Sequence, residues 1–119
     1  MKSKDKTIIY HNARCRKSRA GLAWLESKEV PFEIKEYMKT GVTAEELREL
    51  LMRLNVPPQQ IIRTQEADYK SRFRGKGFTD DEWIQIISEN PKLLKRPMVI
   101  KKYQAVWADP PEAMDILFL

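Results

Sequence analysis

The chain has 119 residues, of which 42% are hydrophobic and 33% charged, and its formal net charge is +5 at pH 7. This length favours one domain with a modest core, and the composition excludes a largely disordered chain. No stretch approaches the roughly 20 apolar residues of a membrane span, and no signal-peptide run follows the basic start. One cysteine cannot form an internal disulfide, which fits a reducing compartment. We therefore expect a cytoplasmic protein with no membrane partner.

The excess positive charge gathers around the only cysteine, Cys15. Residues 1–25 carry a balance of +6, whereas the other 94 residues carry a balance of −1. A local excess suits a small anion or an acidic protein patch better than the long backbone of a nucleic acid. We expect no direct nucleic-acid binding, and the alternative is a solvated basic tail beside a helix end.

The first third of the chain predicts a strand, a helix and a strand. "KTIIYH" at 6–11 is a short β-branched run, and the segment after Cys15 has helical spacing. "FEIKEY" at 32–37 alternates Phe32 and Ile34 with polar residues, as a strand does. A right-handed crossover would make the two strands parallel. The predicted helix has one face formed by four residues and flanked by two leucines: Ala20, Ala23, Trp24 and Ser27, with Leu22 and Leu25 beside them.

The middle of the chain predicts two helices that begin with capping boxes. Thr43 and Glu46 open the first, and Thr79 and Glu82 open the second. Between them, "QQIIR" at 59–63 predicts a helical turn after two prolines, and "YKSRFRGKG" at 69–77 predicts a mobile basic loop. The predicted apolar faces are Leu47, Leu50, Leu51 and Leu54 in the first helix and Trp83, Ile86 and Ile87 in the second.

The last segment predicts a hairpin and a closing helix. "RPMVIKK" at 96–102 and "QAVWAD" at 104–109 are β-rich, and "PPEAMDILFL" at 110–119 enters a helix through proline. The order β-α-β, helices, β-β-α predicts an α/β protein with a thioredoxin-like sheet. We expect one domain over residues 1–119, with a central helical insertion at about 43–92.

Cys15 is the candidate nucleophile. A free thiol is only about 3% thiolate at pH 7, and a helix N-terminus with a nearby cation increases that fraction. Side chains one and two residues apart on a helix diverge, so Arg14, Arg16, Lys17 and Arg19 cannot all face the sulfur. Backbone N–H groups from Arg16 onward are better placed to hold an oxyanion. The alternative is an inert core cysteine.

Ser18 stands where a C-x-x-C motif has its second cysteine. A hydroxyl can donate to a thiolate but cannot resolve a mixed disulfide, so turnover would need an external thiol. Its alternative is an ordinary first-turn serine. His11 could tune the site or be structural, and one Cys with one His cannot form a zinc site. We expect no metal and no bound cofactor.

Several phrases make the chain resemble the arsenate reductase family of the monothiol, glutaredoxin-dependent type, with the Spx-type regulators among its relatives. They are "YHNARCRKSR" at 10–19, "IIRTQ" at 61–65, "FTDDEWIQIISENPKLLKRPMVI" at 78–100 and "PPEAMDIL" at 110–117. The resemblance covers nearly the whole chain and implies a thioredoxin-like fold. It also implies a small oxyanion or thiol substrate, glutathione as co-substrate and glutaredoxin as partner.

The resemblance assigns roles by position. It makes Cys15 the catalytic thiol, places Arg63, Arg96, Ser18 and Arg16 in substrate binding, and gives His11, Asn12 and Pro97 supporting roles, with Pro97 following a cis bond. A third family arginine is replaced here by Asp109, whose carboxylate would repel arsenate unless it is turned away. Two alternatives stay open: a Spx-like regulator that binds RNA polymerase, and a non-catalytic relative. We expect a monomer.

Overall fold

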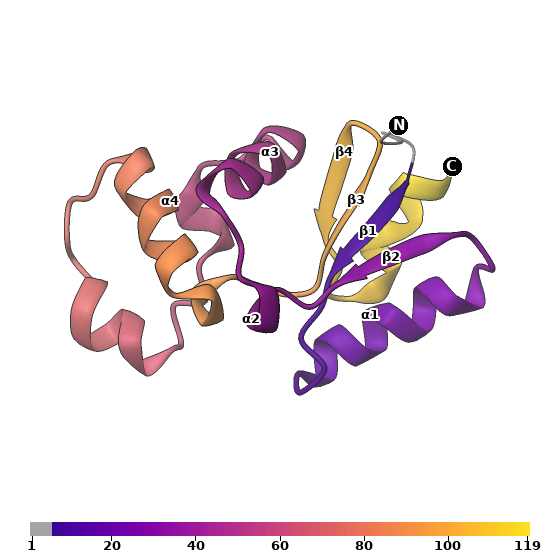
Figure 1. Ribbon diagram of the computed structural model, residues 1–119, viewed down its shortest axis with the longest axis horizontal. Helices are drawn as coiled ribbons and strands as arrows, with labels where there is room; N and C mark the ends of the chain where they lie inside the picture. The colour runs from indigo at the N-terminus through magenta and orange to yellow at the C-terminus, as the bar shows by residue number, and fades with distance from the viewer. Residues whose placement is uncertain (1–5) are drawn as a thin grey trace. The chain divides into compact units, whose positions relative to one another are not determined.

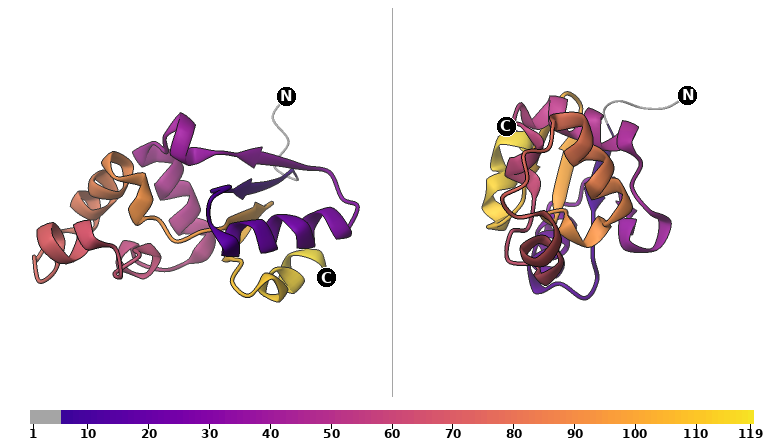
Figure 2. Two further views of the ribbon diagram at one scale, coloured as in Figure 1. Left: turned by 90° about the horizontal axis from the view of Figure 1, so that it is seen from below. Right: turned by 90° about the vertical axis from the view of Figure 1, so that its left-hand side faces the viewer.

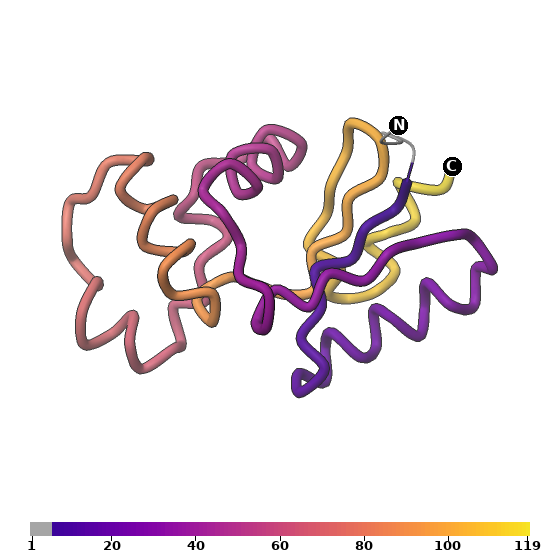
Figure 3. The backbone as a smooth tube through the Cα atoms, in the orientation of Figure 1, coloured from indigo at the N-terminus to yellow at the C-terminus, as the bar shows by residue number. Residues whose placement is uncertain are grey.

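The computed structural model describes residues 6–119, which form two compact units (Figure 1). The sheet unit combines residues 6–40 with 96–119, and the helical unit is Gly41–Lys95. Along the backbone, the chain leaves the sheet unit after its fortieth residue and returns to it at Arg96 (Figure 3). The sequence predicts a single domain over residues 1–119 with an insertion at about 43–92. That the two units act as one domain stays a prediction.

The sheet unit has four strands in the order β2-β1-β3-β4. They are β1 (Thr7–Tyr10), β2 (Phe32–Lys35), β3 (Met98–Lys101) and β4 (Gln104–Trp107). Strand β1 runs parallel to β2 and antiparallel to β3, and Ile9 pairs with Ile34 on one side and Val99 on the other. The antiparallel pair of β3 and β4 is the predicted hairpin. The predicted parallel crossover and the mixed α/β sheet are both confirmed.

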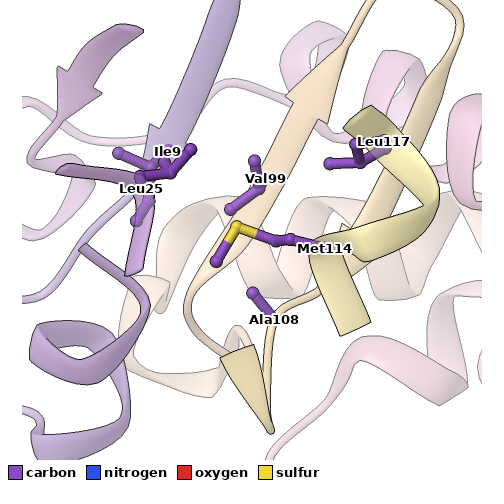
Figure 4. Packing of buried hydrophobic residues seen from close by; sticks show 6 residues of the cluster. All are labelled: Ile9, Leu25, Val99, Ala108, Met114 and Leu117. Atoms are coloured by element: carbon purple, nitrogen blue, oxygen red, sulfur yellow. The ribbon is translucent and has the colours of Figure 1, made fainter. Parts of the chain in front are cut away.

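Two helices, α1 (Arg16–Ser27) and η4 (Pro111–Phe118), cover one face of this sheet (Figure 2). Their buried side chains meet those of β1 and β3 in one apolar cluster, shown in Figure 4: Ile9, Leu25, Val99, Ala108, Met114 and Leu117. A short helix, α2 (Tyr37–Thr40), follows β2. The predicted closing helix is present at η4, but it is a 3₁₀-helix rather than an α-helix.

The predicted face of α1 is wrong at Ala20, Ala23 and Ser27, which are exposed, whereas Trp24 packs against the apolar cluster and Leu25, predicted beside that face, is buried. The buried residues are Ser18, Gly21 and Leu25. A Cβ atom added at Gly21 would lie 2.7 Å from Cγ of Pro97, so this face is selected for close approach. Glycine and serine carry little hydrophobic signal, and the pattern of apolar residues therefore pointed elsewhere.

The strand predicted from Phe32 and Ile34 is present as β2, and Ile34 on it is 43% exposed. Strand β2 is an edge strand of the sheet. Phe32 on the same strand packs against the apolar cluster as expected. The alternation correctly predicted a strand, but it did not show that an edge strand leaves one of its apolar residues largely in solvent.

The helical unit contains α3 (Ala44–Leu54), α4 (Asp80–Glu89) and three short turns, η1 (Pro58–Ile61), η2 (Tyr69–Phe73) and η3 (Pro91–Leu93). Both capping boxes are confirmed: Glu46 N–H donates to Thr43 Oγ1 at 3.0 Å, and Glu82 N–H donates to Thr79 Oγ1 at 3.1 Å. Such caps satisfy donors that the helix itself cannot use. The predicted apolar face of α3 is buried at Leu47, Leu50 and Leu51.

Two expectations for the helical unit need correction. In α4 the buried residues are Trp83, Ile84 and Ile87, and Ile86 is only partly buried. The predicted loop at 69–77 begins with a π-helical turn, η2, in which Phe73 is buried. The ring of Phe73 meets Trp83 edge-on with centroids 6.3 Å apart. This aromatic packing orders a segment that its basic composition marked as mobile.

Within residues 6–119, every helix is too short or too polar to cross a membrane.

Candidate functional site

Cys15 is the N-cap residue of α1. Its backbone is extended, and its N–H donates to the carbonyl of Asn12 at 2.9 Å. The loop before it is held by Asn12, whose Oδ1 accepts the N–H of Arg14 at 3.0 Å. Asparagine favours such turns because its short side chain bonds the backbone two residues on. The loop therefore delivers the sulfur to the first turn of α1, where the predicted helix start is confirmed.

The pKa of the Cys15 thiol is shifted by opposing causes. Burial raises it, but the backbone N–H of Ser18, the guanidinium of Arg96 and the backbone N–H of Lys17 donate to the sulfur and lower it. The positive charge of Arg96 lowers it further, and the net pKa lies below the usual value for a cysteine. Donors to the charged form favour that form. The thiolate is thus more abundant at neutral pH than in a free cysteine.

Ser18 contacts the sulfur through its backbone. Its side chain is fully buried, and its Oγ accepts the N–H of Asn12 at 3.2 Å. The hydroxyl therefore ties the loop to the first turn of α1, so that the loop and the amides that bond the sulfur keep one arrangement. Both Asn12 and Ser18 lie beside Cys15, and their supporting and binding roles stay predictions.

Arg96 enters the sheet unit just before β3, and the Arg96–Pro97 bond is cis, as the resemblance implies. The carbonyl of Arg96 accepts from Trp107 Nε1 at 3.2 Å, and the carbonyl of Pro97 accepts from the N–H of Ala108 at 2.9 Å. These bonds fix the segment against β4. Arg96 is the side-chain cation that hydrogen-bonds the sulfur, and Arg16 is exposed.

His11 is buried, with 5% of its surface exposed. The backbone N–H of His11 donates to the carbonyl of Lys35 at 2.9 Å. The ring nitrogen Nδ1 has no hydrogen-bond partner among the described residues. Burial lowers its pKa, an effect that Glu36 and a backbone hydrogen bond to Ser18 oppose. His11 is therefore neutral at neutral pH, because its pKa lies below the usual value of about 6.5.

An ion pair that the sequence did not predict involves Lys17, the residue whose backbone N–H donates to the Cys15 sulfur. Lys17 Nζ is 3.0 Å from Asp109 Oδ2, and the Asp109 side chain is 26% exposed. The same ammonium lies 5.8 Å from the centroid of the Trp107 ring. No local spacing signals this pair, because its two members stand at opposite ends of the chain.

Arg63 belongs to the helical unit. Its guanidinium pairs with the carboxylate of Glu66, and its N–H donates to the carbonyl of Leu93 at 2.7 Å. The predicted role of Arg63 in binding substrate stays a prediction. Across residues 6–119, no three histidine, cysteine or acidic side chains cluster in a way that could hold a metal ion.

Comparison with known proteins gives a family and a fold. The family model of the ArsC family matches residues 10–116. An arsenate reductase of Haemophilus influenzae is 35% identical over 109 residues, covering 90% of this chain and 94% of the relative. The global transcriptional regulator Spx 2 of Bacillus anthracis is 24% identical over 94 residues, covering 78% of this chain and 72% of the regulator.

A solved structure agrees with this assignment. The arsenate reductase of Vibrio cholerae is 34% identical to this chain and superposes on it with a TM-score of 0.87. The match covers 91% of this chain and 93% of the Vibrio protein. Its match extends the thioredoxin-like fold to nearly the whole of the present chain. The family match over residues 10–116 shows that the chain belongs to the ArsC family.

Proposed function

We propose that the protein is a thiol oxidoreductase in which the Cys15 thiolate attacks an oxyanion or a disulfide. The observation that carries the proposal is the environment of the sulfur, which accepts from two amides of α1 and from the Arg96 guanidinium and has a lowered pKa. A cysteine with these neighbours and a lowered pKa is thiolate more often than a free cysteine, and Cys15 is partly exposed, so it can react. A purely structural cysteine does not require a guanidinium that donates a hydrogen bond to its sulfur.

The first step forms one bond to sulfur and breaks another. With a disulfide, Cys15 Sγ bonds one sulfur atom, and the second sulfur leaves as a thiolate. With an oxyanion, Sγ bonds the central atom, and an oxygen takes up protons from solvent and leaves as water. In either case the first-turn amides and Arg96 are the donors available to the charge that develops.

The second step needs a thiol from outside the chain, because Cys15 is the only cysteine. Glutathione is the proposed co-substrate: its thiolate attacks the bond that Cys15 has formed, and the electrons it supplies end in a disulfide. A glutaredoxin would reduce the mixed disulfide when glutathione itself remains on Cys15. This assignment rests on the family resemblance and on the chain's need for a resolving thiol.

The names of relatives favour a reductase. The protein of Haemophilus influenzae that matches most of this chain is called an arsenate reductase, and reduction of an oxyanion or disulfide is the chemistry that Cys15 is suited for. A cytoplasmic location would supply glutathione and keep the lone thiol reduced.

The test measures glutathione-dependent reduction of bis(2-hydroxyethyl) disulfide without glutaredoxin, which would reduce this disulfide by itself, and of arsenate with a glutaredoxin present. Wild type should turn over at least one of them, and Cys15→Ser should lose the activity, because a hydroxyl is a far weaker nucleophile at neutral pH. Arg14→Gln is the matched control, since Arg14 is exposed and its side chain lies outside the thiol's contacts. Full activity in Cys15→Ser would overturn the proposal.

The similarity to Spx 2 favours a second candidate, a regulator that binds RNA polymerase. A regulator would bind purified polymerase in solution whether or not Cys15 is present, and it would turn over neither substrate. An enzyme of the proposed kind would turn over substrate and leave polymerase unbound.

A further inference from the structure

We propose that Asp109 selects the substrate class of Cys15: by holding Lys17 in an ion pair, it turns the site toward disulfides of low charge and away from divalent tetrahedral oxyanions. This inference rests on the proposed function and narrows it. It is drawn from the charges that surround the sulfur and from the groups that each of them contacts.

The ion pair and the thiol are joined through one residue. The backbone N–H of Lys17 donates to the Cys15 sulfur, and the ammonium of the same residue lies 3.0 Å from Asp109. Trp107, which lies 5.8 Å from that ammonium, donates from its indole to the carbonyl of Arg96. The pair is therefore anchored to the same strand ends that hold Arg96 against the sulfur.

Each of the two cations, Arg96 and Lys17, already has an anionic partner. The Arg96 guanidinium contacts the thiolate, and the Lys17 ammonium contacts the Asp109 carboxylate. A divalent oxyanion that enters would have to take one of these cations from its present partner. It would also approach a carboxylate that is only 26% exposed and so is weakly screened by water. A neutral disulfide meets neither obstacle.

The other cations near the first turn of α1 have a weaker effect on an anion at the sulfur. Arg14 and Arg16 have exposed side chains, and Arg19 is exposed with its guanidinium donating to the carbonyl of Ala13 at 2.9 Å. Exposed charges act through water and salt, which weaken their effect on a group at the sulfur. The Lys17 side chain is itself 54% exposed, whereas the Asp109 carboxylate is 26% exposed, so Asp109 is the least screened charge of this group.

The reaction of the favoured class balances without another oxidant. Sγ bonds one sulfur of RSSR and expels RS⁻, and glutathione then attacks the Cys15–SR disulfide. A second glutathione completes the exchange, so that RSSR and two glutathione molecules become two RSH and one glutathione disulfide. Each disulfide exchange conserves the total charge: the negative charge passes from Sγ to the departing RS⁻ and returns to Sγ when glutathione releases Cys15.

The first experiment compares alkylation of Cys15 by iodoacetate, which is an anion, and by iodoacetamide, which is neutral. The ratio of the two rates is independent of the thiolate fraction, because both reagents attack the same thiolate. Removing one charge beside the site in Asp109→Asn should raise the iodoacetate-to-iodoacetamide ratio by about 3- to 10-fold. Lys17→Gln should lower it.

Asp115→Asn is the matched control, since Asp115 is an exposed aspartate of η4 in the same unit. Its ratio should equal that of wild type. An unchanged ratio in Asp109→Asn, or an equal rise in Asp115→Asn, would overturn the inference. This readout needs no turnover, so it tests the charge of the site even if the proposed function fails.

The second experiment measures turnover of the neutral bis(2-hydroxyethyl) disulfide and of arsenate. Wild type should prefer the disulfide, and Asp109→Asn should shift the ratio of kcat/KM toward arsenate by about 3- to 10-fold. Efficient use of arsenate by wild type would overturn the inference while leaving the proposed function intact. The activity of Cys15→Ser tests the proposed function. The role of Asp109 is tested separately, by the alkylation ratio and the kcat/KM ratio of Asp109→Asn.

Discussion

The Cys15 sulfur is held by donors of two origins. The amides of Lys17 and Ser18 come with the helix that Cys15 caps, so they are present wherever α1 forms. The guanidinium of Arg96 comes from the segment before β3 and reaches the sulfur only when the sheet is assembled. Reactivity of the thiol is therefore expected to depend on folding as well as on local sequence.

Arg96→Gln should make Cys15 less reactive at neutral pH. Loss of the guanidinium removes both a hydrogen bond to the thiolate and a positive charge, so the thiol pKa should rise toward its usual value. Hydrogen bonds to charged groups contribute about 1.5–3 kcal/mol, which corresponds to about 10-fold or more in alkylation rate. The measurement is the rate of iodoacetamide labelling as a function of pH.

Arg14→Gln controls for the general loss of one positive charge, because Arg14 is exposed and near in sequence. Its alkylation profile should follow that of wild type. If Arg96→Gln and Arg14→Gln shifted the profile equally, the specific contact of Arg96 with the sulfur would be refuted.

At the scale of elements, α1 and the β3 segment approach each other through Gly21 and Pro97. An added Cβ at Gly21 would lie 2.7 Å from Pro97 Cγ and 3.8 Å from the carbonyl oxygen of Ala108. The proline ring has little freedom to move away. A glycine in the middle of a helix is unfavourable in itself, so its presence here is explained by this close approach.

Gly21→Ala should destabilise the protein although alanine favours helices. Overpacking costs about 1–3 kcal/mol, and the gain in helix propensity of about 1 kcal/mol offsets only part of it. Chemical unfolding would measure the difference in the free energy of unfolding. The variant should also slow alkylation of Cys15, because a displaced Pro97 carries Arg96 with it.

Gly77→Ala is the matched control, because a Cβ at Gly77 meets nothing within 4 Å. This change should leave stability unchanged or raise it by about 0.4–1 kcal/mol through the unfolded chain. Equal effects of the two alanine substitutions would show that Pro97 does not restrict the space at Gly21.

At the scale of the whole molecule, the lowered thiol pKa links the charge of one residue to the stability of the fold. The unfolded chain has an ordinary cysteine pKa near 8.5 and holds the proton over a range in which the folded chain has released it. Stability therefore rises with pH through the folded-state pKa, and the contribution is complete only above the unfolded value. It is lost as the pH falls through the folded-state pKa.

Cys15→Ser should remove this contribution. The difference in urea midpoint between wild type and Cys15→Ser should grow in favour of wild type as the pH rises from neutral to above the usual thiol pKa. The comparison cancels the titration of groups that both proteins share. Parallel profiles over this range would mean that the thiol pKa is the same in the folded and unfolded chains.

The sequence by itself determined the features that depend on near neighbours. The two capping boxes, the hairpin and the start of α1 at Cys15 each follow from residues within one turn or one strand. The fold class followed from the order of these elements. Local chemistry is sufficient for such features because the interacting groups are a few residues apart.

Only the tertiary structure decided the face of α1 that is buried and the ion pair of Lys17 with Asp109. Gly21 and Ser18 carry too little hydrophobic signal to mark a buried face, and the π-helical turn at η2 depends on contacts of Phe73 with Trp83 in another helix. Lys17 and Asp109 meet because β4 ends beside the first turn of α1. A periodic pattern cannot encode contacts between distant segments, because it records only spacing along the chain.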